Sequence, residues 1–460
     1  MKNCEVGILD LIEKINSRQA NIGIVGLGYV GLPLCIAFAQ TGFRVTGIDL
    51  NQEKVDILNK GYSYITDVKD EDIQFIVDNG HFKATTEFSC MSFLDAICIC
   101  VPTPLNKNLD PDLSAIEYVV DKLKKHLRPG TLVVLESTTY PGTTEERIEK
   151  ALALTDLHAG IDYHLCYSPE RVDPGNKKYT ILNTPKVIGG VTNNCLKLAE
   201  TLYGTIVNQI FPVSTPKVAE VSKLLENTFR SINIAFINEM ALMCDSLGVN
   251  IWEVIKAAST KPFGFMPFYP GPGIGGHCIP LDPMYLTWRA KEENFFSRFI
   301  ELSQDINRNM PKYVVGKISE LLNAQKKCVN GGRILLLGMA YKPDVNDHRE
   351  SPSLNVYELL KEKGAVITVN DPFCDHILDV NDQQINIQTE MNYEELCHYD
   401  LIALLTAHST YDFKRIAESG VPILDTRNAF NGLNTPHVTC IGDVLKEAGP
   451  VISETVLAGG

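Results

Sequence analysis

A single cysteine, Cys278, lies in a loop rich in glycine and proline, YPGPGIGGHCIPLDP at 269–283, with Asp282 four residues after it. A thiolate is nucleophilic near neutral pH and can add to an aldehyde. If a hydride acceptor lies nearby, the adduct can lose hydride to give a thioester, which water hydrolyses. The glycines would let the loop backbone approach a ligand closely. A structural loop with an inert cysteine fits the composition equally well.

A second group of polar residues has helical spacing. Lys223, Asn227 and Arg230 stand at i, i+4 and i+7, so they share one face of the predicted helix over 215–247. A buried lysine–asparagine pair is costly unless it meets a partner or ligand, and such a pair could stabilise an oxyanion. Ordinary hydrogen bonding between domains is the alternative interpretation. The helix is apolar nearly all round, which favours burial against a second subunit or between domains.

The stretch NIGIVGLGYVGLPLCIAFAQTGFRVTGIDLN has the pattern of a βαβ unit. Gly26, Gly28 and Gly31 form G-x-G-x-x-G between strand and helix, and Asp49 ends the next strand. These glycines permit a tight turn, close approach of a pyrophosphate and helix–strand packing, while the helix N-terminus attracts phosphate. Asp49 would bind the adenosine ribose and repel a 2′-phosphate, so the sequence predicts NAD rather than NADP.

Polar residues also follow later strands of the same domain. Thr103, Ser137, Thr138 and Glu170 stand where predicted strands end, and ligands of open α/β sheets bind beyond the carboxyl ends of strands. The alternatives are that Thr138 caps the following helix and that Glu170 is a solvated loop acid.

A second βαβ-like pattern begins near residue 334, but Gly338 stands without the other two glycines. Its loop offers Lys342, Asp347 and Arg349, which could hold phosphate or sugar or simply be solvated. We therefore predict an α/β protein with two Rossmann-like, doubly wound domains joined by a long-helix domain. The predicted boundaries are 1–210 for NAD binding, 211–325 for the central helical domain with the cysteine loop, and 326–460 for the C-terminal domain.

The composition excludes other classes of function. The chain has 460 residues and a net charge of −14, which disfavours nucleic-acid or anionic-membrane surfaces. It has no apolar run that could span a bilayer and no signal-peptide pattern. Its 13 cysteines lack metal-ligand spacing, so we expect no metal and a reduced, cytoplasmic protein.

The chain resembles the UDP-glucose/GDP-mannose 6-dehydrogenase family over essentially its full length. The matching motifs, in the family's order, are GLGYVGLP, VPTP, ESTTYPGTTEE, SPERVDPGN, KLLENTFR, GPGIGGHCIPLDP and AYKPDVNDHRES. The resemblance implies that a sugar C6 alcohol is oxidised to the carboxylate by two NAD+ at one active site. It also implies a UDP-sugar site in the C-terminal domain and a homodimer, or a higher homo-oligomer, built on the long helix.

The resemblance implies specific roles for residues of this chain. Cys278 matches the nucleophile, Lys223 and Asn227 the oxyanion-stabilising pair, Asp282 the acid that assists lysine and water, Glu170 the general acid/base, and Thr138 the hydroxyl near the nicotinamide. The implied cofactor-binding residues are Gly26, Gly28, Tyr29, Val30, Gly31, Asp49, Thr103, Thr138 and Arg349. The implied substrate-binding residues are Glu170, Lys223, Asn227, Arg230, Tyr269, Gly273, Gly275 and Lys342.

Residues that differ from the usual family motifs indicate which class of UDP-sugar the protein oxidises. Members acting on UDP-glucose usually have lysine where this chain has Leu281, and His277 precedes the cysteine. GGHCIPLDP is similar to the branch that oxidises UDP-N-acetylhexosamines, and ESTTYPGTTEE is most similar to members acting on UDP-N-acetylglucosamine. A base role for His277 is a weaker alternative. Pro174 replaces the family's second cofactor-side acid.

Other functions stay open from the sequence. UDP-N-acetylgalactosamine, UDP-N-acetylmannosamine and UDP-glucose are the alternative substrates. A non-catalytic NAD and nucleotide-sugar sensor, or a two-electron hydroxyacid dehydrogenase, are alternatives of other classes. The second would need neither the thiol nor the third domain.

Overall fold

The computed structural model describes residues 2–65, 68–106, 108–171, 178–379, 381–433 and 435–443. Pro174 therefore lies outside the described residues. The chain forms two compact units. The first contains Met1–Phe229 and Leu281–Ile300, and the second contains Arg230–Pro280 and Glu301–Gly460.

The first unit is built on an eight-stranded sheet in the order β3-β2-β1-β4-β5-β6-β7-β8. Its strands are β1 (Asn21–Val25), β2 (Arg44–Ile48), β3 (Phe82–Thr85), β4 (Ala96–Ile99), β5 (Leu132–Leu135), β6 (His164–Tyr167), β7 (Lys186–Gly190) and β8 (Ile210–Val213). All neighbours are parallel except β6 and β7, which run antiparallel. The order of the first six strands is that of a doubly wound dinucleotide-binding fold.

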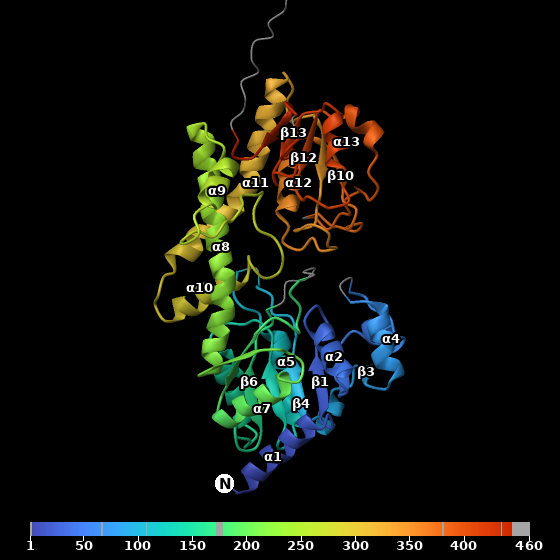
Figure 1. Ribbon diagram of the computed structural model, residues 1–460, viewed down its shortest axis with the longest axis vertical. Coiled ribbons are helices and arrows are strands. Elements are labelled where there is room, and N and C mark those ends of the chain that lie inside the picture. Colours follow the sequence, from blue (N-terminus) through green and yellow to red (C-terminus); the bar gives the residue numbers. More distant parts are fainter. Residues whose placement is uncertain are drawn as a thin grey trace, which may run out of the picture. The chain divides into compact units, whose positions relative to one another are not determined.

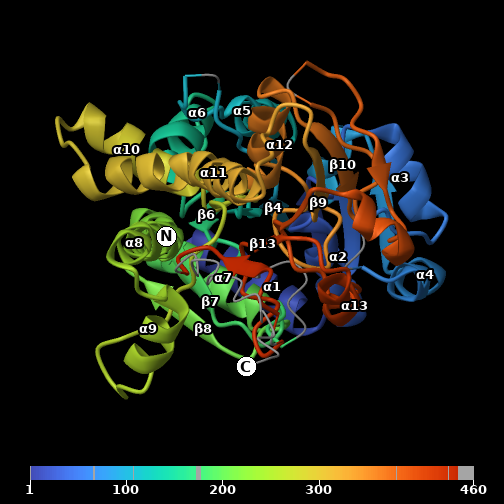
Figure 2. The same cartoon turned by 90° about the horizontal axis from the view of Figure 1, so that it is seen from above.

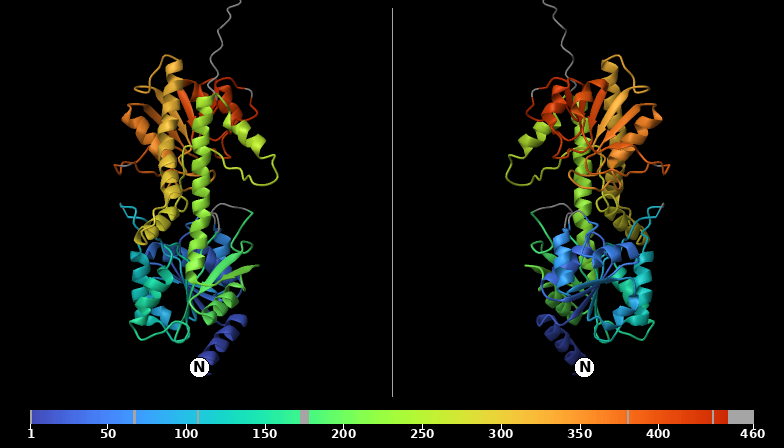
Figure 3. Two further views of the ribbon diagram at one scale, coloured as in Figure 1. Left: turned by 90° about the vertical axis from the view of Figure 1, so that its left-hand side faces the viewer. Right: turned by 90° about the vertical axis from the view of Figure 1, so that its right-hand side faces the viewer.

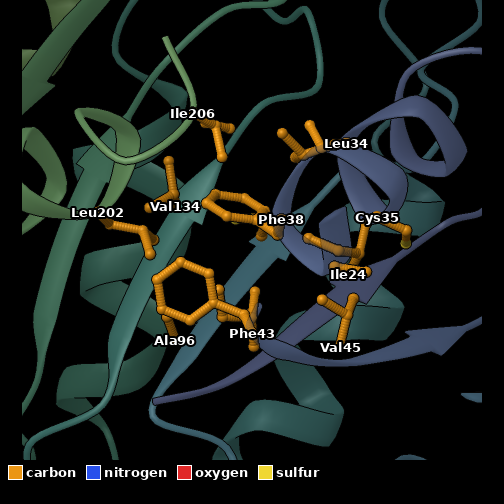
Figure 4. Packing of buried hydrophobic residues seen from close by; sticks show 14 of the residues in the cluster. Ile24, Leu34, Cys35, Phe38, Phe43, Val45, Ala96, Val134, Leu202 and Ile206 are labelled. Atoms are coloured by element: carbon orange, nitrogen blue, oxygen red, sulfur yellow. The ribbon is translucent and has the colours of Figure 1, made fainter. Parts of the chain in front are cut away.

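Helices cover both faces of this sheet (Figure 1). They are α1 (Lys2–Asn16), α2 (Gly31–Gln40), α3 (Gln52–Asn59), α4 (Asp70–Asp78), η1 (Phe88–Phe93), α5 (Ser114–His126), η2 (Thr144–Glu149), α6 (Lys150–Ala153), α7 (Asn193–Tyr203) and α10 (Asp282–Glu292). Alternate residues of one strand enter different cores: Cys98 of β4 packs with α2 and α7, whereas Ile97 packs with α5. Figure 4 shows the first core, where Phe38 lies among Val134 and Leu202. Burial on both faces explains the almost continuous apolar runs of these strands.

The second unit holds a six-stranded, all-parallel sheet in the order β11-β10-β9-β12-β13-β14. The strands are β9 (Arg333–Leu337), β10 (Val366–Asn370), β11 (Ile387–Gln388), β12 (Leu401–Leu404), β13 (Ile423–Asp425) and β14 (Val438–Cys440). Its helices include α9 (Ile251–Ala258), α12 (Pro352–Glu362), η3 (Tyr393–His398) and α13 (Phe413–Glu418). The helices α12 and α13 pack on opposite faces of the sheet (Figure 2). The prediction of two Rossmann-like domains is confirmed.

Two long helices contribute residues to both units. The predicted helix over 215–247 is confirmed as α8 (Pro216–Leu247), which Figure 3 shows as one continuous helix. The second is α11 (Arg298–Ala324), which contains Pro311. The three-domain boundaries of the sequence analysis stay a prediction.

Candidate active site

The glycine loop after β1 has the shape that a dinucleotide needs. Gly26 has φ +91°, and a Cβ there would lie 2.5 Å from the carbonyl oxygen of Cys100. A Cβ on Gly31 would lie 1.8 Å from the carbonyl oxygen of Gly26, so both positions require glycine. A Cβ on Gly28, by contrast, meets nothing within 4 Å. Gly28 therefore faces open space in the unit, at the position where the fold brings pyrophosphate to the backbone.

The start of α2 and the end of β2 lie beside the glycine loop, and together the three segments form the proposed dinucleotide cradle. Val30, the N-cap residue of α2, makes no side-chain hydrogen bond to the first turn, and the amide of Leu32 donates to the carbonyl of Gly28 (3.1 Å). The N-terminus of the helix carries a partial positive charge that attracts an anion. Tyr29 is 41% exposed beside it. The carboxylate of Asp49 accepts hydrogen bonds from the amides of Leu27 (2.9 Å) and Asn51 (3.0 Å). The acid is thereby fixed next to the glycine loop, and these residues fit NAD.

The loops after β4 and β5 are joined to each other. The hydroxyl of Thr103 donates to the carbonyl of Thr138 (2.6 Å), and that of Ser137 donates to the carbonyl of Val101 (2.7 Å). The Tyr285 hydroxyl of α10 donates to the carbonyl of Thr103. The structure thus brings Thr103 and Thr138 together. The next helical segment has Thr143 as its N-cap residue, so Thr138 does not cap it.

Lys223, Asn227 and Asp282 form a buried polar cluster in the first unit. The two α8 residues are 8% and 7% exposed, and Asp282, the first residue of α10, is 3% exposed. The Asn227 side-chain amide donates to the Asp282 carboxylate. Burial raises the pKa of Asp282 to about 6, although the charge of Lys223 and the hydrogen bond from Asn227 act in the opposite direction. A carboxyl group with this pKa can exchange protons near neutral pH.

Arg230 and Glu170 differ from their simplest sequence interpretations. Arg230 is exposed, unlike Lys223 and Asn227, so the predicted i+7 continuation of the buried face is not buried with them. The Glu170 side chain is 14% exposed, and its Oε2 lies 3.5 Å from the ammonium nitrogen of Lys186. Glu170 is therefore not a solvated loop acid.

The cysteine loop belongs to the second unit, and Cys278 is exposed there. The amide of Gly271 donates to the Asn238 side chain (3.0 Å), and that of Gly276 donates to the carbonyl of Arg349 (3.0 Å). The Gln304 side chain donates to the carbonyl of Pro280 (3.2 Å). The loop is therefore held at three points by its own backbone atoms.

Close packing explains the glycines of this loop. A Cβ on Gly275 or Gly276 would lie 2.7 Å from Tyr341 atoms. Gly273 has φ +133°, and a Cβ there would lie 3.1 Å from Pro352. The predicted substrate residue Tyr269 is 59% exposed, and its ring stacks on Trp252 with centroids 6.0 Å apart.

The loop after β9 carries the remaining predicted residues. Arg349 is exposed and makes a bidentate ion pair with Asp347, at 2.9 and 2.7 Å. Lys342 is half-buried, with its ammonium group 5.7 Å from the Tyr341 ring. Burial, followed by the charge of Arg349, lowers the pKa of His277, so its imidazole is neutral at pH 7.

Three further residues were not predicted from the sequence: Glu136, Lys186 and Tyr203. They form a buried network in the first unit, with the Lys186 ammonium 2.7 Å from the Glu136 carboxylate. The signal available in the sequence was a charged residue next to an apolar strand, as in LVVLE and PKVIGG. That signal does not identify the partner.

No group of three or more potential metal ligands occurs among the residues that the structure describes. Within the same residues, no helix is both long enough and apolar enough to cross a membrane.

Three domains of one known family match consecutive segments of the chain. Residues 20–207 match the NAD binding domain of the UDP-glucose/GDP-mannose dehydrogenase family, 217–309 match its central domain, and 335–432 match its UDP binding domain. These matches confirm the prediction of NAD as the cofactor.

Individual proteins with names from this family are also similar to the chain over most of its length. The UDP-N-acetyl-D-mannosamine dehydrogenase of Campylobacter jejuni is 35% identical over 84% of this chain and 95% of its own. The UDP-N-acetyl-D-glucosamine 6-dehydrogenase of Pseudomonas aeruginosa is 32% identical over 88% and 94%. The solved UDP-D-ManNAc dehydrogenase of Pyrococcus horikoshii has a TM-score of 0.83 and 32% identity, covering 92% of this chain and 100% of its own. The fingerprint, the two sheets and these likenesses show that the chain is an NAD-dependent oxidoreductase that belongs to the UDP-glucose/GDP-mannose dehydrogenase family.

Proposed function

We propose that the protein oxidises the C6 hydroxyl of UDP-N-acetylglucosamine to the uronic acid in two NAD-dependent steps. The observation that carries the proposal is the buried cluster of Lys223, Asn227 and Asp282, which combines a cation, an amide donor and a carboxyl group with a raised pKa. A two-electron hydroxyacid dehydrogenase would need neither the thiol nor the third domain.

The proposed chemistry begins with oxidation of the C6 alcohol to the aldehyde, in which the hydroxyl proton passes to the Glu170 carboxylate and a hydride leaves C6. The Cys278 thiolate adds to C6 and forms a thiohemiacetal, whose oxyanion Lys223 and Asn227 stabilise. NAD would be held by Gly26, Gly28, Gly31 and Asp49, and it would supply the hydride acceptor for both oxidations. Loss of the second hydride leaves a thioester on Cys278.

Hydrolysis then completes the sequence. A water molecule attacks the thioester carbonyl, its proton passes to a carboxylate, and the thiolate leaves. Asp282 and Glu170 are the proposed proton acceptors, and Thr138 is proposed to orient the water. The backbone of the loop over 269–276 and Lys342 are proposed to line the UDP-sugar, and Arg349 to contact the cofactor.

The choice of sugar rests on ESTTYPGTTEE and GGHCIPLDP, and on a relative named as a UDP-N-acetyl-D-glucosamine 6-dehydrogenase. Relatives named for mannosamine and for galactosaminuronic acid make those epimers the second candidates. We place the reaction in the cytoplasm, where it would supply uronic acid units for surface polysaccharide.

The test is the number of NADH formed per UDP-N-acetylglucosamine supplied, with NAD+ in excess. Two NADH and the uronic acid as product are expected. One NADH with accumulated aldehyde would contradict the covalent second step. No NADH with this sugar, but two with the manno or galacto epimer or with UDP-glucose, would reassign the substrate.

We also propose a homodimer that buries α8. Large apolar side chains are exposed at three- to seven-residue spacing along it: Val218, Val221, Leu225, Phe229, Phe236, Met243 and Leu247. Apolar residues repeated in this way form a seam for another helix. Leu225→Glu, at a side chain 62% exposed, should shift sedimentation from dimer to monomer, whereas Glu53→Lys, at an exposed residue of α3 outside this seam, should not.

A further inference from the structure

A buried ion pair lies close to Glu170 in the first unit. Lys186, the first residue of β7, is 5% exposed in its side chain, and Glu136, which directly follows β5, is fully buried. The Nζ of Lys186 lies 2.7 Å from Oε2 of Glu136, and the Tyr203 hydroxyl donates to Oε1. Each Glu136 oxygen therefore has a donor, which offsets the cost of removing the two charges from water.

Lys186 has a second carboxylate beside it. Oε2 of Glu170 lies 3.5 Å from the Lys186 Nζ, while the amide of Arg171 donates to Oε1 of Glu170 at 2.7 Å. Oε1 of Glu170 thus accepts the amide of the next residue, and the buried Oε2 lies at ion-pair distance from the Lys186 ammonium. The antiparallel pairing of β6 with β7 makes this possible, because it places the start of β7 beside the loop that leaves β6.

The residue next to Glu170 holds the same loop from the other side. The Arg171 guanidinium lies 2.7 Å from the Glu226 carboxylate on α8 and donates to the carbonyl of Pro185 at 2.8 Å. Glu226 is adjacent to Asn227 of the proposed oxyanion pair, and Pro185 is adjacent to Lys186. Glu170 is therefore connected to both β7 and α8 within the first unit.

The electrostatics indicate that Lys186 remains a cation. Burial disfavours its charge, but the carboxylates of Glu136 and Glu170 outweigh burial and raise the pKa of Lys186. A buried cation strongly favours the ionised form of a carboxyl group within a few ångströms. Glu136 binds the Lys186 ammonium, and Tyr203 in turn binds Glu136. These contacts restrict movement of the ammonium group away from Glu170.

We propose that Lys186 is a positioning residue that keeps the Glu170 carboxylate ionised and oriented for proton transfer, with Glu136 and Tyr203 holding Lys186 in place. This inference rests on the proposed role of Glu170 as an acid/base. It adds Lys186 and Tyr203, which lie outside the family motifs, and gives a role to Glu136, the first residue of ESTTYPGTTEE. The competing explanation is a purely structural ion pair that stabilises the sheet.

The first test measures the Glu170 carboxyl directly. Protein labelled with ¹³C at the glutamate carboxyl carbons is titrated by NMR, and the Glu170 signal is assigned as the one that Glu170→Gln removes. We expect Lys186→Met to move the titration midpoint of Glu170 upward by about one pH unit or more, and Lys186→Arg to restore it. An unchanged midpoint in Lys186→Met would overturn the proposal.

The second test measures turnover with the sugar that the wild type oxidises. We expect Lys186→Met to lower kcat about 10- to 100-fold while KM changes less than about threefold, with substantial recovery in Lys186→Arg. On a Glu170→Gln background, the same substitution should cost less than about threefold. Equal losses on both backgrounds would show that Lys186 does not act through Glu170.

Two controls separate folding from function. Lys317→Met removes another buried lysine, whose ammonium lies 2.7 Å from the partly exposed Asp245, and it should leave the Glu170 titration unchanged. If Lys186→Met alone does not fold, the double variant Lys186→Met/Glu136→Gln removes both charges and takes its place in each test. If the wild type oxidised no UDP-sugar, the proposed function would be wrong, yet the NMR titration would still decide whether Lys186 controls Glu170.

Discussion

The loops that follow the first strand of each sheet have the same turn but different surroundings. Gly26 and Gly338 have φ of +91° and +87°, and a Cβ on either would lie 2.5 Å from a carbonyl oxygen, that of Cys100 or Thr406. Two residues later the first loop has Gly28, which faces open space, and the second has Ala340. The turn is common to both sheets, while room for a phosphate is found at Gly28.

The acids at the ends of the second strands differ in the same way. Asp49 accepts hydrogen bonds from two amides, whereas Asp371 is surrounded by five donors: the amides of Met339, Ala340, Phe373 and Cys374, and the ring of His408. A carboxylate has about four lone-pair sites. The acceptor sites of Asp371 are therefore occupied by donors of the protein itself. In this chain, the acid at the end of the second strand is available to a ribose in the first sheet and not in the second.

The largest expected effect separates cofactor binding from chemistry. Cys278→Ser should lower turnover about a thousandfold or more, because serine is a far weaker nucleophile at neutral pH. NAD+ affinity, measured by calorimetry, should be unchanged, since Cys278 is not among the residues proposed to hold the cofactor. Cys328→Ser, at another exposed cysteine, is the control. Normal turnover in Cys278→Ser would remove the covalent mechanism.

A matched pair of glycine substitutions tests the two turns. Gly28→Ala should leave the melting temperature unchanged and weaken NAD+ binding about tenfold or more, because the backbone can no longer approach the pyrophosphate. Gly338→Ala should lower stability by about 1 to 3 kcal/mol, because the new Cβ meets Thr406 in a left-handed turn, and should leave NAD+ affinity intact. Reversed outcomes would break the comparison.

The two acids give a second matched pair. Asp49→Asn should reduce NAD+ affinity about tenfold, since it loses a charged acceptor for the ribose. It should cost less stability than Asp371→Asn, because the amide that loses its acceptor lies at a partly exposed site. Asp371→Asn should cost about 3 kcal/mol of folding stability, because buried amides lose their acceptor. Loss of NAD+ binding in Asp371→Asn, at full stability, would show a cofactor role for the second sheet.

Protonation distinguishes the buried acids further. Burial raises the pKa of Asp282 to about 6, whereas for Asp371 burial is outweighed by His408 and by backbone amides, and its pKa is lowered. If the Asp282 carboxylate accepts the proton of water, kcat/KM should fall about tenfold per pH unit below pH 6. The fall in kcat/KM below pH 6 should be missing from the residual activity of Asp282→Asn. If the fall persists in this variant, a group other than Asp282 causes it.

The same shift has a stability consequence with a definite sign. The folded-state pKa of Asp282 lies above the ordinary value of about 4, so the folded protein binds this proton more tightly than the unfolded chain does. Its contribution favours folding at low pH and is lost as the pH rises through 6. Asp371, with a lowered pKa, contributes stability that is lost as the pH falls.

Much of the fold and of the candidate site was predictable from the sequence, because the sequence patterns that indicate them are local. The glycine fingerprint with Asp49 and the apolar period of α8 each lie within about 30 residues, and the structure has the corresponding elements. The Lys186 network was not predictable, because strand pairing brings Lys186 to Glu136, which lies 50 positions earlier, and to Glu170, which lies 16 positions earlier. The exposure of Arg230 does not follow from helical spacing, which places it within about 20° of Lys223 around the helix. Arg230 belongs to the second unit, whereas Lys223 and Asn227 are buried in the first.

The three backbone anchors of the cysteine loop also limit how this segment can evolve. Gly271, Gly276 and Pro280 are each tied by a main-chain atom, so an inserted or deleted residue between them would misplace at least one tie. Homologous chains should therefore vary here by substitution rather than by length. Nearby surface loops without such ties should carry the insertions that distinguish one member of the family from another.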